Sequence, residues 1–139
     1  MLITRETDYA LRILRALSRG DQMTVAAISQ DQQVPKQFAY KIIKKLSKGG
    51  LVSIARGAEG GCSLAADLRQ VSLYRLLRMM EEAVHLTACM DPDYACPWRE
   101  ANGHCVAHCQ LAALQQTLDR ELQAHSLHQI LFGAENVSA

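Results

Sequence analysis

Residues 34–65 read VPKQFAYKIIKKLSKGGLVSIARGAEGGCSLA, and this order predicts a helix followed by a β-hairpin. Pro35 suits the beginning of a helix, where a missing N–H is tolerated, and a glycine pair ends the helix. Residues 51–55 and 62–65 are short segments joined by a glycine-rich turn, which is typical of two paired strands. The apolar stripe of the helix consists of Ala39, Ile42, Ile43 and Leu46.

The opposite side of this helix is basic. Between Asp31 and Glu59 the chain has no acidic residue but six lysine or arginine residues. Such a segment is typical of a protein that binds a polyanion, although most charged faces are merely solvated. Residues 1–69 hold eleven Lys or Arg against six Asp or Glu, and residues 70–139 hold four against eight. The basic excess therefore belongs to the N-terminal half, although the net charge of the whole chain is only +1.

Two helices precede the basic helix. An apolar period of three and four residues predicts the first over residues 5–19, and Thr24 predicts the N-cap of the second. Three helices followed by a glycine-rich hairpin predict a winged helix-turn-helix, whose third helix enters the major groove of DNA. Its exposed side chains would reach the bases, and the wing would lie on the backbone or minor groove. The residues expected to contact DNA are Lys36, Gln37, Tyr40, Lys41, Lys44, Lys48, Arg56, Gly57, Gly60 and Gly61.

The C-terminal half adds two amphipathic helices, one capped by Ser72 and reaching residue 83, and one of about 18 residues from Cys105. We expect the second helix to form a symmetric homodimer, because its stripe is longer than a small domain covers alone. The alternative is that the stripe packs back on the winged domain. The stripe consists of Leu111, Leu114, Leu118 and Leu122.

These elements predict a fold that is mainly α with a small β-hairpin wing. Residues 1–69 would form the winged helix-turn-helix DNA-binding domain. Residues 70–139 would form the cysteine-bearing loop and the dimerisation helices, packed as one unit with that domain.

The segment from Cys89 to Cys109 holds four of the five cysteines and little apolar material. We expect Pro92 and Pro97 to block regular helix there. A loop this long and poor in core is costly to order unless something binds it, and thiols and imidazoles are soft metal ligands. The segment therefore predicts a metal centre with candidate ligands Cys89, Cys96, Cys105, His108 and Cys109.

Other features limit the class of protein. No run of apolar residues is long enough to span a bilayer, and the N-terminus has no secretory pattern, so we expect a cytoplasmic protein that acts away from membranes. No nucleophile has a recognisable base and orienting carboxylate, so we do not expect an enzyme. We expect Cys62 to be a small buried hydrophobic residue, and His104, His125 and His128 to be ordinary surface histidines.

The chain resembles the Rrf-type family of bacterial winged-helix regulators, typified by IscR, NsrR and RirA. The resemblance covers nearly the whole chain and rests on MLITRETDYALRIL at the start, the segment 35–61, three spaced cysteines and SLHQIL near the end. It implies a dimeric transcriptional regulator that binds operator DNA. It also implies an iron–sulfur cluster, 2Fe–2S or 4Fe–4S, that changes operator binding.

The resemblance further implies which residues hold the cluster. Cys89, Cys96 and Cys105 match the three cluster cysteines, and His108 matches a histidine that is a fourth ligand in some members. Asp8 stands where other members have a carboxylate that reaches the cluster of the partner subunit. Cys109, the wide cysteine spacing and Glu59 in the wing depart from the family pattern, so the cluster type and the signal stay open.

The sequence leaves two alternatives open. The first is a winged-helix regulator that binds zinc or no metal and uses its cysteines as redox thiols, although zinc prefers ligands in compact pairs. The remote second is a thiol- or metal-dependent enzyme. Cys109 is equally well explained as a ligand or as a small buried hydrophobic residue.

Overall fold

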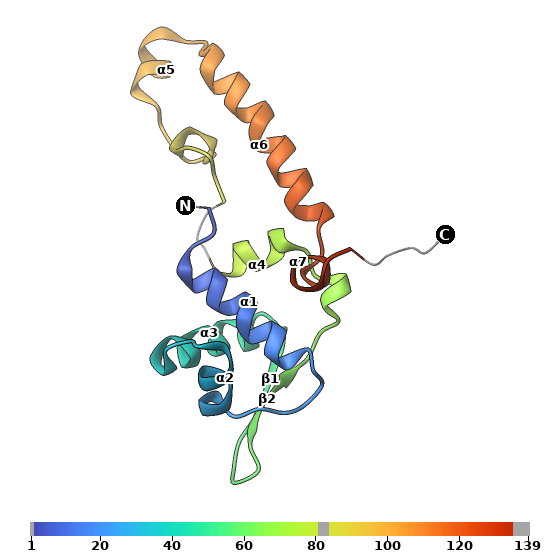
Figure 1. The fold of residues 1–139 in the computed structure, drawn as a ribbon. Helices are drawn as coiled ribbons and strands as arrows, with labels where there is room; N and C mark the ends of the chain where they lie inside the picture. Colours follow the sequence, from blue (N-terminus) through green and yellow to red (C-terminus); the bar gives the residue numbers. More distant parts are fainter. Residues whose placement is uncertain (1, 81–83, 135–139) are drawn as a thin grey trace, which may run out of the picture.

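A computed structural model of the chain describes residues 2–80 and 84–134. It is mainly helical with one two-stranded antiparallel hairpin (Figure 1), which confirms the predicted fold class. Two short 3-10 turns, η1 (Leu68–Gln70) and η2 (Ala88–Met90), lie between the longer elements. The helices are α1 (Arg5–Leu17), α2 (Val25–Gln32), α3 (Lys36–Lys48), α4 (Leu73–Met80), α5 (Pro97–Asn102), α6 (Val106–Ala124) and α7 (Leu127–Phe132).

The helices begin where the sequence supplies caps. Thr24 Oγ1 accepts from the Ala27 N–H at 3.1 Å at the start of α2, and Ser72 Oγ accepts from the Arg75 N–H at 3.1 Å at α4. Each cap satisfies a backbone donor that has no partner inside the helix. The prediction that the Ser72 helix reaches residue 83 falls partly on residues 81–83, which lie outside the described residues.

Helices α1, α2 and α3 pack on one another and on the hairpin of β1 (Val52–Ala55) and β2 (Gly61–Leu64). The strands pair with Val52 opposite Leu64 and Ala55 opposite Gly61. Met23 adds a short antiparallel bridge to Cys62, with N–H···O distances of 2.9 and 2.7 Å. The bridge anchors the base of the wing to the loop between α1 and α2.

One hydrophobic core joins both halves of the chain. It takes Ile13, Leu14 and Leu17 from α1, and Leu76 and Leu77 from α4. It also includes Leu127, which α7 brings against α1 and η1. A backbone bridge between Ser72 and Ser126 fixes α7 beside the start of α4. Burial of these side chains contributes roughly 1.5–3 kcal/mol each to folding.

The cysteine segment leads away from this core to α5, and helix α6 leads back to the core from there (Figure 1). Its stripe is divided. Leu122 is 8% exposed and belongs to the chain's own core, and Leu118 packs against that core. Leu114 is 59% exposed. The C-terminal part of the stripe therefore packs back on the chain's own core, as the alternative to a dimer contact predicted.

The expectation that prolines prevent helix in the cysteine segment is wrong at Pro97. Pro97 is the first residue of α5, a position where its missing N–H costs no hydrogen bond and its fixed φ favours the helix. None of the α5 residues is buried. Among the described residues, no helix is long and apolar enough to cross a membrane.

Candidate functional site

The outer face of α3 gathers the side chains that the sequence assigns to DNA. Its inner face is buried through Ala39, Ile42, Ile43 and Leu46, so the intervening residues must face outward. Tyr40 is 57% exposed although it is large and partly apolar. The exposed polar or basic residues of α3 are Lys36, Gln37, Tyr40, Lys41, Lys44 and Lys48.

Contacts with α1 and α2 fix the orientation of α3. Arg15 on α1 donates to the side-chain oxygen of Gln32 at 2.8 and 3.2 Å, and Gln32 is buried. Arg12 donates to the Gln32 carbonyl at 3.4 Å. The next residue, Gln33, turns the chain with a φ of 53°, a left-handed conformation that is uncommon outside glycine. These hydrogen bonds and the turn at Gln33 fix the start of α3 relative to α1 and α2.

One acid enters the basic face from a distant part of the sequence. Glu6, in the first turn of α1, pairs with Lys41 Nζ at 2.7 Å and with Lys45 Nζ at 2.9 Å. The two lysines hold the pKa of the Glu6 carboxyl below its usual value of 4.5. Sequence reasoning missed this contact, because no local pattern links a residue of the first helix to the third.

The tip of the wing, residues 56–59, is exposed, and Arg56 with it. Gly57 has a φ of +105°, which disfavours any other residue. Gly61 has a structural reason to lack a side chain, since a Cβ there would lie 2.8 Å from the Met23 carbonyl oxygen. A Cβ on Gly60 would lie 2.5 Å from the Ala55 oxygen. The fold gives each of these three glycines a structural reason, and their contact with DNA stays a prediction.

The candidate metal ligands lie at the edges of three short elements. Cys89 is in η2, Cys96 precedes α5 as its N-cap, and Cys105 precedes α6 as its N-cap. All three are partly exposed free thiols. The backbone N–H of His108 lies 3.4 Å from Cys105 Sγ. A helix N-terminus favours the thiolate, so Cys105 is well placed to act as an anionic ligand.

His108 carries an unsatisfied polar atom. Its Nδ1 is buried and has no hydrogen-bond partner among the described residues. A buried imidazole nitrogen without a partner is costly unless something binds it, and a soft metal is one ligand that would. The donor set thus fits a metal group in chemical type.

The same donors do not converge on one point. In residues 2–80 and 84–134, no three His, Cys, Asp or Glu side chains are near enough together to hold a single metal ion. Cys109 is exposed on α6, so its interpretation as a small buried residue is wrong. Asp8 forms an ion pair with Arg12 at 3.0 Å within α1 and is partly exposed.

A polar clamp holds the start of the cysteine segment against α6. The side chain of Gln115 accepts from the Leu86 N–H at 2.7 Å and donates to the Val84 carbonyl at 2.8 Å. It also donates to Asp119 at 2.8 Å. Gln115 is buried. The only sequence signal for this role is the place of Gln115 on the leucine-bearing side of the helix, between Leu111 and Leu118.

The remaining cysteine and histidines match their simpler interpretations. Cys62 is buried, and burial raises the pKa of its thiol. His104 is exposed. His125 lies 3.4 Å from Glu121, and His128 packs beside the Phe132 ring.

The chain is similar in sequence to transcriptional regulators. Residues 3–132 match the model of the Rrf2 family, which is described as an iron-dependent transcriptional regulator. An HTH-type transcriptional regulator from Aquifex aeolicus is 27% identical over 110 residues, which is 78% of this chain and 76% of the relative.

Two solved structures share the fold. CymR, the global cysteine regulator of B. subtilis, superposes with a TM-score of 0.70 at 18% identity and covers 96% of this chain and 98% of its own. IscR of T. potens superposes with a TM-score of 0.67 at 19% identity and covers 99% of this chain and 90% of its own.

Proposed function

The chain belongs to the Rrf2 family of transcriptional regulators, and from this premise we propose that it is a cytoplasmic homodimer whose operator binding is controlled by an iron–sulfur cluster. Family and relatives are regulators rather than enzymes. What is specific to this chain is the choice of residues that read DNA and that hold the cluster.

The observation that carries DNA binding is the division of α3 into a buried face and an exposed face that bears the basic residues. An α-helix fits the major groove, and its exposed side chains then meet base edges and phosphates. Gln37, Tyr40 and Lys41 face the bases in this arrangement. The four cations Lys36, Lys44, Lys48 and Arg56 neutralise phosphates, and the wing lies along the backbone.

The exposed part of α6 supports the dimer. Val106 and Leu114 are both more than half exposed, whereas Leu122 packs inside its own chain. We place the dimer contact along the N-terminal two thirds of α6, away from the core. We expect a twofold axis there to place both α3 helices on one side of the duplex, as dimeric helix-turn-helix proteins do.

For the cluster, Cys89, Cys96 and Cys105 are the proposed thiolate ligands, with His108 as the fourth. The buried, unpaired His108 Nδ1 supports this choice. Asp8 of the partner subunit and Cys109 are the alternative fourth ligands. When bound, the cluster supplies bonds that depend on iron supply and on oxidation.

The chain's own residues convert those bonds into a conformational change. No three of the donors lie together among the described residues, so we expect ligation to draw residues 84–105 and the start of α6 together. Gln115 ties the start of that segment to α6, and α6 packs on α4, which in turn packs on α1 and α3. Movement of the segment therefore reaches both the dimer helix and the DNA-binding unit.

The test of the cluster is the absorption spectrum of anaerobically purified protein, together with analysis of iron and acid-labile sulfide. We expect a coloured protein with iron and sulfide in equal amounts. The His108→Ala variant should lose most of the colour and Cys109→Ser should keep it. A colourless protein containing zinc or no metal would reject the cluster in favour of redox thiols.

The test of DNA binding is the salt dependence of affinity for a duplex. Four cations per subunit give eight phosphate contacts and a log–log slope of roughly −7. Lys44→Gln should reduce the slope by about two, because the dimer loses the contact twice. Arg120→Gln removes the same charge from the exposed surface of α6 and should leave the slope unchanged. A wild-type slope near zero would reject α3 as the DNA-binding face.

A further inference from the structure

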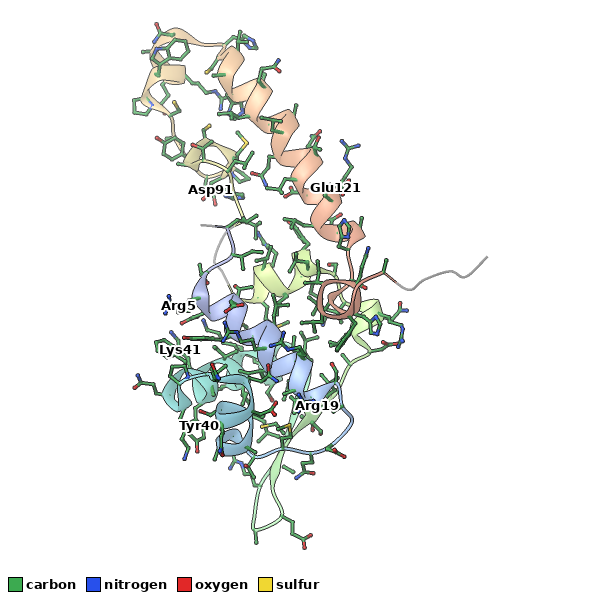
Figure 2. The ribbon with its side chains drawn as sticks, viewed as in Figure 1. Arg5, Arg19, Tyr40, Lys41, Asp91 and Glu121 are labelled. Atoms are coloured by element: carbon green, nitrogen blue, oxygen red, sulfur yellow. The ribbon has the colours of Figure 1, made fainter. Side chains whose placement is uncertain are left out.

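The Glu6 carboxylate is an acid within a face that otherwise presents cations. It bridges Lys41 and Lys45, which are one turn apart on α3, with Nζ–O distances of 2.7 and 2.9 Å. Figure 2 shows Lys41 beside the N-terminal end of α1, near Arg5. The lysine side chains remain 58% and 35% exposed, so they are accessible to another anion.

We propose that Glu6 is a specificity-determining residue, an internal competitor that occupies Lys41 and Lys45 until base contacts align α3 in the groove. This inference rests on the proposed DNA-binding role of α3. A phosphate must displace the carboxylate or share the lysines with it. Binding that depends on phosphates alone is therefore weakened.

The charge arithmetic gives the size of the effect. With Glu6 ionised, the three side chains carry a net charge of +1 per subunit instead of +2. The depressed pKa of Glu6 keeps it ionised at neutral pH. One charge per subunit is two per dimer, which corresponds to a change of about −1.8 in the log–log salt slope. Relative to 1 M salt, each charge at 0.1 M salt is worth about eightfold in affinity, or roughly 60-fold for the two charges of the dimer.

The Glu6 charge should lower the affinity for non-specific DNA more than the affinity for the operator. Non-specific affinity comes essentially from phosphate contacts, while specific affinity also draws on base edges. On its operator, Lys41 sits beside Gln37 and Tyr40 at the bases and gains contacts that repay the exchange with Glu6. Removing the carboxylate should therefore strengthen non-specific binding more than operator binding.

The experiment compares the wild type with Glu6→Gln, which keeps the shape of the side chain and removes its charge. Glu121→Gln is the matched control, because it makes the same change on the exposed surface of α6, far from α3 (Figure 2). The probes are a fluorescent 30-base-pair duplex of random sequence and an operator selected from a random pool with the wild type. Affinity is measured by anisotropy over a range of salt concentrations, and folding is checked by circular dichroism.

We expect Glu6→Gln to bind the random duplex tens of times more tightly at 0.1 M salt, with a slope steeper by about two, and to gain less on the operator. Glu121→Gln should match the wild type. An unchanged slope in folded Glu6→Gln, beside a wild type with a normal slope, overturns the inference and leaves the proposed function standing. Loss of binding in Glu6→Gln also overturns it, since Glu6 would then only position the lysines. A wild-type salt slope near zero overturns the proposed function and this inference together.

Discussion

Replacing Gln115 with leucine should destabilise the protein by about 2 kcal/mol, although the substitution introduces an apolar residue at a buried helix position. The Gln115 side chain makes hydrogen bonds of 2.7 and 2.8 Å to the backbone of Leu86 and Val84. Each such bond contributes about 1 kcal/mol net, and a buried group left unpaired costs about 1–3 kcal/mol. Val84 is 2% exposed, so its carbonyl has little access to water as a replacement partner. The apolar surface gained by leucine offsets part of this cost.

The assay is thermal and urea unfolding of the metal-free protein, with Gln116→Leu as the control. Gln116 is the next residue on α6 and is exposed, so its replacement tests helix propensity and surface change without the clamp. A loss of about 2 kcal/mol should lower the midpoint of thermal unfolding of Gln115→Leu by roughly 6–10 °C. Gln116→Leu should stay within about 2 °C of the wild type.

Hydrogen exchange provides a second measurement, because residues 84–90 could detach from α6 without unfolding the whole chain. In that case the amides of this segment should exchange faster in Gln115→Leu while the core amides keep their protection. Equal unfolding midpoints and equal exchange in the two variants would refute the reasoning that Gln115 holds the cysteine segment.

Three further predictions address the interface, the wing and the acid response. Leu114→Glu should yield monomers in sedimentation velocity without loss of helicity, because Leu114 is 59% exposed and does not support the core. A variant that remains dimeric at micromolar concentration would contradict the proposed α6 contact. Gly61→Ala should lower stability by about 1–3 kcal/mol, since its Cβ would meet the Met23 oxygen at 2.8 Å, and a midpoint equal to the wild type in urea would refute the close contact. The pKa of Glu6 is depressed below its usual value of 4.5 in the folded protein by its hydrogen bonds to Lys41 and Lys45. Its pairing therefore stabilises the fold above the unfolded pKa, and this contribution disappears as the pH falls through the lower folded value. Glu6→Gln should lose less stability than the wild type as the pH falls below 4.5, and equal losses of stability in the two proteins would count against the ion pairs.

Apolar periodicity and capping residues were enough to predict the helices whose formation depends on neighbouring residues in the sequence. The amphipathic period of α1 and α3 and the caps at Thr24 and Ser72 correspond to helices in the structure. Pro97 was misjudged because a proline that breaks a helix in its interior can also begin one. The long helix that carries the leucine stripe is present as α6, but the division of the stripe between Leu122 and Leu114 depends on where α6 leaves the core.

The features missed from the sequence are contacts between distant segments. Glu6 is 35 residues from Lys41 and Gln115 is 31 residues from Val84, and no periodicity links such pairs. The composition of the cysteine segment predicted soft ligands, and their separation in space became evident only with the fold. Polar residues that bridge elements are invisible to a pattern built on apolar spacing.

The proposed control of DNA binding by the cysteine segment is tested most directly by comparing the operator affinity of three forms of the protein. The operator affinity of the anaerobic cluster-loaded protein, the metal-free protein and Cys96→Ser is measured at one salt concentration. Coupling of 1–3 kcal/mol predicts that the loaded protein differs from the other two by about 5–150-fold, with Cys96→Ser resembling the metal-free protein. Equal affinity in all three would contradict the account and leave a DNA-binding protein whose cysteine segment regulates nothing.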